Sequence, residues 1–344
     1  MPGVRFGLVG YGAWGGHHAR AIASVPGAEL VAIAAHSEVS CARAGADHPG
    51  ARVYADHRAM LAQERLDVAD VVLPSHLHHA VAKDVLLSGR HLLLEKPMAL
   101  SLAQCDELVR LARERQRILA VGHELRLSPL WGLAKELIDS GAIGEPRYAL
   151  IDLWRRPYRP GSDDWRYDIG RVGSWVLEEP IHFLDLARWY FSGLGEPLSV
   201  FASASGKRPD RPELHDNFSA VLAFPRGAHA VVTQTLGGWE HHQTARLTGT
   251  EGALWASWSG ATDRTFEPTF GLKLMRGDRV EEVAIAKPPG EVYELVEQIA
   301  RVARAVRDGT PVACTGEDGC WSVAMCLAAQ ASIGSGRPVP FAEG

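Results

Sequence analysis

The sequence predicts an α/β protein in which a doubly wound parallel sheet precedes a second domain with a large, open, mostly antiparallel sheet. The first 120 residues alternate short apolar runs with stretches of helical spacing, the pattern of a parallel sheet covered on both faces. After Val121, longer runs of alternating apolar and polar residues indicate antiparallel strands. Because 344 residues exceed one ordinary core, we expect two domains, residues 1–122 and 123–344.

The apolar runs give the expected elements of both domains. The parallel strands are expected at Arg5–Val9, Leu30–Ala34, Val68–Leu73 and His91–Leu94, with a helix over Ala13–Val25 after the first strand. In the second domain we expect helices at Leu130–Ser140 and Pro180–Ser192, and strands at Tyr148–Trp154, Leu198–Ser205, Phe218–Phe224, Ala228–Leu236 and Thr244–Thr248. The short tail after Gly336 is expected to form an edge strand.

The first apolar run leads into a glycine-rich turn with the spacing G-x-G-x-x-G. Gly10 permits a tight turn, Gly12 lets the backbone approach a pyrophosphate, and Gly15 lets the next helix pack closely on the sheet. The phosphates would lie at the helix N-terminus, where N–H groups are free to bind an anion. The order of strand, turn and helix therefore predicts a binding site for NAD or NADP.

The end of the second strand bears on the choice between the two cofactors. An acidic residue there binds the ribose 2′-OH of NAD, whereas small, hydroxyl or basic residues accommodate the 2′-phosphate of NADP. The expected acid position is Ala35, and His36 and Ser37 follow it, which favours NADP. Glu38 keeps NAD open, as does the alternative that His36 and Ser37 are solvated loop residues and both cofactors are used.

The composition excludes several classes of protein. A net charge of −5 with both signs interspersed gives no basic surface for nucleic acid. The five cysteines form no C-x-x-C pair, which is typical of free thiols in a reducing compartment, and no metal is expected. The first strand begins near residue 4, and no apolar run approaches 18 residues. We therefore expect a cytoplasmic protein without a membrane partner.

Two further segments carry residues suited to catalysis. A buried strand ends in Glu95-Lys96-Pro97, and a lysine at the carboxyl edge of a parallel sheet faces the crevice where ligands bind. Its ammonium group can stabilise a developing alkoxide. His182 follows Pro180 in the first turn of a predicted helix, where the helix dipole favours a neutral imidazole base. The alternative for His182 is a core or helix-capping histidine.

These segments together resemble the Gfo/Idh/MocA family of oxidoreductases, the relatives of glucose-fructose oxidoreductase and inositol dehydrogenase. The resemblance covers nearly the whole chain and is carried by GYGAWG, PSHLHHAVAKDVLLSGRHLLLEKPMAL, ELIDSGAIGEP and VGSWVLEEPIHFLDLARWYFSG. It implies an N-terminal Rossmann domain and a C-terminal α/β domain whose open sheet faces the nicotinamide and makes oligomer contacts. In the relatives the equivalents of Lys96 and His182 are catalytic, and the Lys96-Pro97 peptide is expected to be cis.

The reaction that the resemblance implies is hydride transfer between nicotinamide and a secondary alcohol of a sugar or cyclic polyol. Glu178 is expected to set the protonation state of His182, with Glu179 as the rival candidate. Inositol dehydrogenase relatives have aspartate at the position of Glu178, and asparagine at that of Glu124. These departures put the identity of the substrate in doubt.

The motifs and the resemblance to inositol dehydrogenase relatives together imply the binding residues. Cofactor contacts are expected at Gly10, Gly12, Ala13, Trp14, Gly15, His36, Ser37, Leu73, Pro74, His76, His78, Glu95 and Lys96. Substrate contacts are expected at Trp154, Arg156, Trp165 and His241. For the tryptophans in polar or turn-rich surroundings, stacking on a polyol competes with the alternative of plain packing in the core.

The resemblance also includes relatives with other functions. Some relatives use a bound NAD for transient oxidation during glycoside cleavage, and a few are regulators that sense nucleotides without catalysis. The presence of both Lys96 and His182 argues against a regulator. The resemblance also implies a homodimer or homotetramer.

Overall fold

The computed structural model describes residues 3–341 and divides into two compact units. The first unit contains residues 1–124 and 292–320, and the second contains residues 125–291 and 321–344. The chain therefore first passes from the first unit to the second after residue 124, and the sequence places the domain boundary after residue 122. The units differ from the expected continuous domains because the chain returns to the first unit after residue 291.

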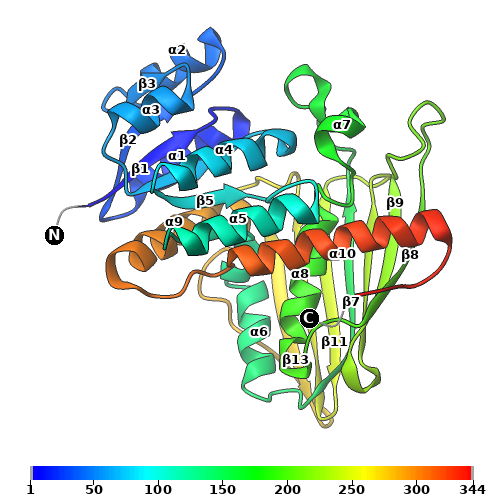
Figure 1. Ribbon diagram of the computed structural model, residues 1–344. Coiled ribbons are helices and arrows are strands. Elements are labelled where there is room, and N and C mark those ends of the chain that lie inside the picture. The colour runs from blue at the N-terminus through cyan, green and yellow to red at the C-terminus, as the bar shows by residue number, and fades with distance from the viewer. Residues whose placement is uncertain (1–2, 342–344) are drawn as a thin grey trace. The chain divides into compact units, whose positions relative to one another are not determined.

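The first unit is built on a parallel sheet, which within residues 3–341 has six strands in the order β3-β2-β1-β4-β5-β6 (Figure 1). This is the strand order of the Rossmann fold, so the predicted doubly wound sheet is confirmed. The elements in chain order are β1 (Val4–Val9), α1 (Ala13–Ser24), β2 (Ala28–Ala34), α2 (Glu38–Asp47), β3 (Arg52–Tyr54), α3 (His57–Gln63), β4 (Val68–Val71), α4 (Ser75–Leu87), β5 (His91–Glu95), α5 (Leu102–Glu114), β6 (Leu119–Gly122) and α9 (Glu291–Asp308).

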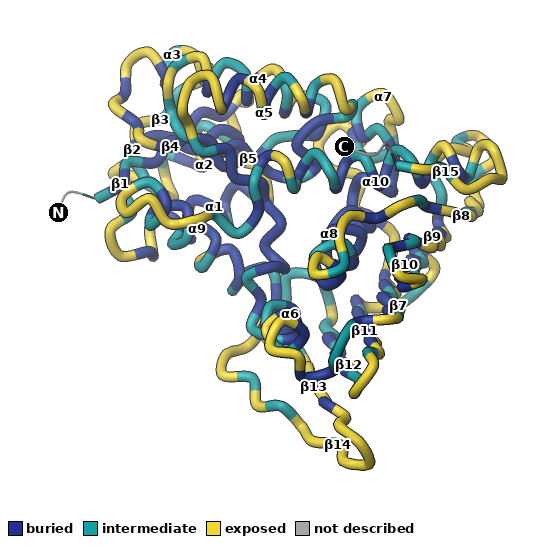
Figure 2. The backbone as a smooth tube through the Cα atoms, turned by 60° about the horizontal axis from the view of Figure 1, so that its bottom comes forward, coloured by how far each residue is buried: buried dark blue, intermediate teal, exposed yellow. Residues whose placement is uncertain are grey.

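Apolar side chains cover both faces of this sheet. On one face, Phe6 of β1 packs with Ile22 of α1 and Ile299 of α9, which explains why the apolar stripe of α9 belongs to the first unit. On the other face, a Cβ on Gly7 would lie only 2.5 Å from Leu66 Cδ1 and 3.0 Å from Met60 Cε. The inner strands β1, β4 and β5 are accordingly mostly buried, as Figure 2 shows in dark blue, whereas the edge strand β3 is not.

The second unit carries a mixed sheet, which within residues 3–341 has nine strands in the order β14-β13-β12-β11-β7-β10-β9-β8-β15. All neighbours are antiparallel except β7 and β10, which confirms the mostly antiparallel sheet. The elements are η1 (Glu124–Leu127), α6 (Trp131–Asp139), β7 (Pro146–Arg155), η2 (Ser162–Tyr167), α7 (Ile169–Val172), α8 (Pro180–Tyr190), η3 (Ser192–Leu194), β8 (Ser199–Ser205), β9 (Asn217–Ala223), η4 (Pro225–Gly227), β10 (His229–Thr235), β11 (His241–Gly249), β12 (Gly252–Gly260), β13 (Thr269–Arg276), β14 (Arg279–Glu282), α10 (Gly316–Ser335) and β15 (Val339–Pro340).

Helices cover one face of the second sheet and leave the other open. Helix α8 packs on β7 and β10, and α6 packs on α8 and β12. From Trp321 onward α10 belongs to this unit, and Ser322 Oγ donates to Asp185 Oδ1 of α8 at 2.9 Å. On the opposite face Phe201 and Trp255 are exposed. The expected edge strand is β15, which pairs with β8.

Candidate active site

The glycine-rich turn between β1 and α1 has the backbone geometry that the sequence predicts. Gly10 has a φ of +104°, and a Cβ there would lie 2.0 Å from the carbonyl oxygen of Val72. A Cβ on Gly15 would lie 2.1 Å from the carbonyl oxygen of Gly10, so the helix packs on the turn itself. A Cβ on Gly12 would meet no described atom within 4 Å, and Gly12 caps α1 without a side-chain hydrogen bond. The N–H groups of the first turn, Ala13 and Trp14 included, can therefore bind a phosphate.

Helix α2 brings a cation to the same turn. The Arg43 guanidinium donates to the carbonyl oxygens of Tyr11 and Gly12, the second at 3.4 Å, and lies 5.1 Å from the centre of the Tyr11 ring. Ser37 caps α2 by accepting from the Ser40 N–H at 3.1 Å. His36 and Ser37 are exposed at the end of β2, where the 2′ substituent of a dinucleotide would lie.

The loops after β4 and β5 are joined by a buried histidine. His78 Nε2 lies 2.7 Å from the carbonyl oxygen of Leu73, and Nδ1 lies 2.7 Å from that of Pro97. Burial lowers the pKa of His78, although the two carbonyl contacts oppose this shift, and the ring contacts both loops. Lys96 follows β5 and is partly buried, and the Lys96-Pro97 peptide is cis, as expected.

The other predicted cofactor residues of the first unit lie on the same edge of the sheet. Leu73 and Pro74 form the turn that leads into α4, and His76 lies in its first turn. Glu95 ends β5, but its carboxylate is buried and lies 3.2 Å from His18 Nε2. Because parallel strands share one carboxyl edge, this unit collects the glycine turn, the β4 loop and Lys96 where ligands bind in such sheets.

In the second unit, polar side chains take buried positions at one end of three neighbouring strands. Arg155 of β7 lies on the same buried face of the strand as Ile151 and Leu153, although it is charged. Gln234 of β10 and His241 of β11 are also buried. Since β11 runs antiparallel to β7 and pairs His241 with Arg155, and β10 runs parallel to β7, these groups meet at the same sheet end.

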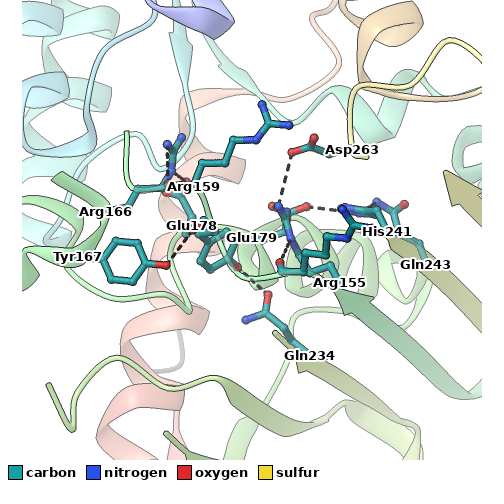
Figure 3. A network of polar contacts seen from close by, with 12 residues as sticks. Arg155, Arg159, Arg166, Tyr167, Glu178, Glu179, Gln234, His241, Gln243 and Asp263 are labelled. Carbon is teal, nitrogen blue, oxygen red and sulfur yellow. Dashed lines mark hydrogen bonds and ion pairs between the residues drawn. The ribbon is translucent and has the colours of Figure 1, made fainter. Parts of the chain in front are cut away.

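The charges of this cluster balance one another (Figure 3). Arg155 Nη1 lies 2.5 Å from Glu179 Oε2, and Arg155 Nη2 lies 3.6 Å from Asp263 Oδ2. Although burial opposes it, the charge of Arg155 holds the pKa of Asp263 below its usual range. Burial and then Arg155 lower the pKa of His241 to about 3, so that ring is neutral.

Hydrogen bonds extend the cluster to uncharged groups. Gln243 Nε2 lies 2.8 Å from His241 Nε2, and the Tyr158 hydroxyl donates to Gln234 Oε1 at 2.7 Å. Burial, with the Glu179 charge adding to it, raises the pKa of Tyr158 well above its usual value. The cluster therefore presents neutral donors and acceptors beside an ion pair at neutral pH.

The segment before α8 brings two carboxylates and His182 to the same region of the second unit. Glu178 accepts from the Arg166 guanidinium, whereas Glu179 pairs with Arg155. Both glutamates are buried. His182 is buried in the first turn of α8, where the sequence predicts it. Its backbone N–H donates to the backbone carbonyl oxygen of Glu179 at 3.0 Å.

The predicted substrate residues divide between different surroundings. Trp154 is 37% exposed and packs edge-on against Trp239 at 5.4 Å between ring centres. Because neighbouring residues of a strand point to opposite faces, Trp154 points away from the face that carries Arg155 and His241. Trp165 is buried and packs in an apolar cluster, with the Arg166 guanidinium 4.5 Å from its ring centre.

The fourth predicted residue, Arg156, is exposed just after β7. The sequence reasoning missed Arg155, Tyr158, Gln234, Gln243 and Asp263. The sequence carries a signal for three of these residues. Arg155, Gln234 and Gln243 are polar, but each lies at a position where the alternation of apolar and polar residues in its strand predicts a buried side chain. No comparable signal marks Tyr158 or Asp263, which come from loops.

The strand order and the glycine turn of the first unit define a dinucleotide-binding protein of the doubly wound class. Residues 4–123 match the model "Oxidoreductase family, NAD-binding Rossmann fold", and residues 131–255 match the model "GFO/IDH/MocA C-terminal domain". The chain belongs to the Gfo/Idh/MocA family of oxidoreductases. Among residues 3–341, no helix has both the length and the apolar character to cross a bilayer.

Relatives with named activities match much or all of the chain. The dTDP-3,4-didehydro-2,6-dideoxy-alpha-D-glucose 3-reductase of Streptomyces violaceoruber is 33% identical over 269 residues, 76% of this chain and 74% of that protein. The myo-inositol 2-dehydrogenase of Thermotoga maritima is 26% identical and covers 99% of each chain. The WlbA dehydrogenase of Bordetella pertussis, solved with NADH and UDP-GlcNAcA, has a TM-score of 0.82 and 25% identity over 99% of this chain and 100% of its own.

Proposed function

We propose that this protein is an NAD(P)-dependent oxidoreductase that exchanges a hydride with a secondary alcohol of a sugar or cyclic polyol. The observation that carries the proposal is the buried cluster of the second unit, in which Arg155 is balanced by Glu179 and Asp263. A site with paired charges and neutral donors suits a neutral ligand rich in hydroxyl groups. The names of the inositol and deoxysugar relatives agree with this substrate class.

The chain's own residues supply proton transfer and orientation. His182 takes the proton of the substrate hydroxyl as a general base. Lys96 donates a hydrogen bond to the same oxygen and stabilises the alkoxide as its charge develops. Glu178 sets the protonation state of His182. The cofactor would be held by the turn from Gly10 to Gly15, and when bound its nicotinamide exchanges the hydride.

The direct test is a screen of cyclic polyols, aldoses and their oxidised forms with NAD and NADP, followed at the absorbance band of reduced nicotinamide. We expect turnover with at least one neutral polyol or sugar and little turnover with small alcohols that lack several hydroxyl groups. Turnover confined to charged acids would contradict the substrate class.

We further propose that NADP is preferred to NAD. Ala35 offers no carboxylate at the end of β2, so nothing at that position selects the 2′-OH or repels a phosphate. Arg43 lies against the neighbouring turn, and Ser37 is exposed beside it. An arginine in this place accommodates the 2′-phosphate of NADP.

Equilibrium titrations of both dinucleotides test this preference. Ala35→Asp should strengthen NAD binding and repel NADP through like charge. Arg43→Ala should weaken NADP binding by about 10- to 100-fold, the worth of charge-assisted hydrogen bonds of about 1.5–3 kcal/mol, and leave NAD binding nearly unchanged. A wild type that already prefers NAD strongly would show that the NADP proposal is wrong.

Two alternative functions make different predictions in the same assay. An NAD-dependent glycosidase would release sugar from a glycoside without a net change in nicotinamide absorbance. A nucleotide-sensing regulator would bind the dinucleotide without turnover of any substrate. The buried polar cluster around Arg155 and Glu179 favours an enzyme over a regulator, because burying charged groups costs stability unless they serve a site.

We also propose a homodimer or homotetramer that acts in the cytoplasm. The open face of the second sheet exposes Phe201, Val221 and Trp255, and contiguous apolar surface of this kind marks an interaction site. The five cysteines, all within the described residues, are free thiols, which is typical of a reducing compartment.

A further inference from the structure

A buried group of charged side chains lies next to Lys96 inside the first unit. His18 of α1 and Asp70 of β4 have no solvent exposure, and Glu95 of β5 is 6% exposed. His18 Nδ1 lies 2.7 Å from Asp70 Oδ2, and His18 Nε2 lies 3.2 Å from Glu95 Oε1. The imidazole is therefore placed between two carboxylates from different strands.

The two contacts favour a charged ring. Nδ1 hydrogen-bonds Asp70, and the contact of Nε2 with Glu95 is an ion pair when the ring carries a second proton. Burial alone would lower the pKa of His18, but Asp70 and Glu95 overcome it and raise this pKa to about 10. At neutral pH His18 is a buried cation within a group whose carboxylates it holds in place.

Glu95 connects this cation to Lys96. The Lys96 N–H donates to Glu95 Oε2 at 3.3 Å, and Trp14 of the glycine turn also hydrogen-bonds the Glu95 side chain. On the neighbouring strand β6, a Cβ on Gly122 would lie 2.7 Å from Glu95 Oε1, so the glycine leaves room for the carboxylate. The Glu95 carboxylate is thus held on several sides.

Other titratable groups face the pair from the remaining elements. Burial lowers the pKa of His78 of α4. Glu124, just after β6, has its pKa raised well above the usual value by burial and then by the charge of Glu95, and Glu294 of α9 adds to this shift. Burial opposes the charge of Glu95, but His18 and then Lys96 outweigh it and lower the pKa of Glu95, so Glu95 is the carboxylate that balances the ammonium of Lys96.

We propose that His18 is a positioning residue for Lys96, which it controls through Glu95: the imidazolium keeps Glu95 ionised and fixed, and Glu95 holds the Lys96 backbone and keeps its ammonium charged. Through His18 and Trp14, helix α1 of the dinucleotide turn also becomes mechanically linked to the lysine. The inference rests on the proposed role of Lys96 and assigns a new role to His18, whose side chain is fully buried.

The first test reads the charge states directly in the full chain. The protein has 15 histidines and six lysines, so selective ¹⁵N-histidine and ¹³C-lysine labelling give resolvable spectra. At pH 8.5, about two units above the ordinary histidine pKa, we expect one histidine to keep an imidazolium spectrum. In His18→Gln that signal should vanish. Because Glu95 is then no longer held ionised beside Lys96, and losing that carboxylate outweighs losing the His18 cation, the Lys96 signal, identified with Lys96→Met, should titrate at least one pH unit lower.

The second test uses turnover with the substrate found in the screen. His18→Gln should lower kcat by about 10- to 100-fold, the effect of displacing a catalytic group by about 1 Å, with KM changed little and the basic limb of the pH profile moved to lower pH. Glu95→Gln should do the same, and the double variant should lose little more, because both act on one path. The matched control is His57→Gln, which removes a histidine 2.9 Å from Asp84 in the same unit and should behave as wild type.

The outcomes separate this inference from the proposed function. A neutral His18 at pH 8.5, or a Lys96 titration that His18→Gln leaves unchanged, would overturn the inference even if the enzyme oxidises polyols. If no polyol is turned over, the proposed function fails, while the two spectra still decide the inference. Should His18→Gln not fold, Asp70→Asn removes one carboxylate and should lower the His18 pKa, and an unmoved His18 titration in that variant also contradicts the inference.

Discussion

At the scale of single residues, the proposed chemistry depends on Lys96 and His182. Loss of a general base or of an alkoxide donor typically costs about 10²–10⁴-fold in rate, so Lys96→Ala and His182→Ala should each reduce kcat by that order. Dinucleotide affinity, measured by titration, should largely survive. Lys83→Ala is the control, since Lys83 pairs with Glu107 on the surface of the first unit. A near wild-type kcat in either variant would remove that residue from the mechanism.

The two adjacent glutamates serve as controls for each other. If Glu178 stabilises the His182 imidazolium, Glu178→Gln should lower kcat and move the acidic limb of the pH profile to lower pH, because an amide stabilises that cation less than a carboxylate does. Glu179→Gln should instead weaken substrate binding, since Glu179 pairs with Arg155 at 2.5 Å. Unchanged pH dependence in Glu178→Gln beside a shifted profile in Glu179→Gln would reverse the assignment.

At the scale of elements, the open face of the second sheet carries a continuous row of side chains. The strand register aligns Lys273, Trp255, Arg246, Leu150, Val231, Val221 and Phe201 across seven strands. Paired residues of neighbouring strands point to the same face, so this row forms one surface in which Trp255 is 55% exposed. Such a surface suits a second copy of the chain.

Substitution within this row should change the state of assembly. Trp255→Glu places a charge in the proposed interface and should lower the mass of the particle measured by light scattering after gel filtration. Trp239→Glu is the matched control, because Trp239 is also exposed but lies in the loop between β10 and β11. An unchanged mass in Trp255→Glu would place the oligomer contact elsewhere or show that the protein is monomeric.

At the scale of the whole molecule, the buried cation of the first unit makes stability depend on pH. Although burial opposes it, Asp70 and Glu95 raise the pKa of His18 in the folded protein to about 10, from an ordinary value of 6.5. The stabilisation is therefore fully present below pH 6.5 and is lost as the pH rises through 10. Between these values, the free energy of unfolding should fall by about 1.4 kcal/mol per pH unit from this group alone.

Urea unfolding at several pH values measures this slope. The comparison is a triple variant, His18→Gln with Asp70→Asn and Glu95→Gln, which keeps polar groups of similar size without the charges. Its free energy of unfolding should lack the extra slope between pH 7 and 9.5. Equal slopes in the wild type and the triple variant would mean that His18 is neutral in the folded protein.

The sequence determined four strands of the first sheet, the glycine turn and the segment around His182, but it did not indicate the short strands β3 and β6. These features are local: apolar runs set the strands Val4–Val9 and His91–Glu95, the glycine spacing sets the turn, and Pro180 marks the first turn of α8. Family resemblance added the cis peptide before Pro97, which the structure contains. Each of these features depends on residues that are close together in the chain, so the local sequence pattern predicts it.

The tertiary structure decided what depends on contacts between distant residues. Helix α9 joins the first unit because its apolar stripe packs on β1 and α1. The pairing of Arg155 with Glu179 and the place of His18 between Asp70 and Glu95 join residues 24 to 77 positions apart. Burial and charge pairing hold these groups in place. Both depend on contacts that form only when distant segments of the chain come together, so the sequence pattern alone does not reveal them.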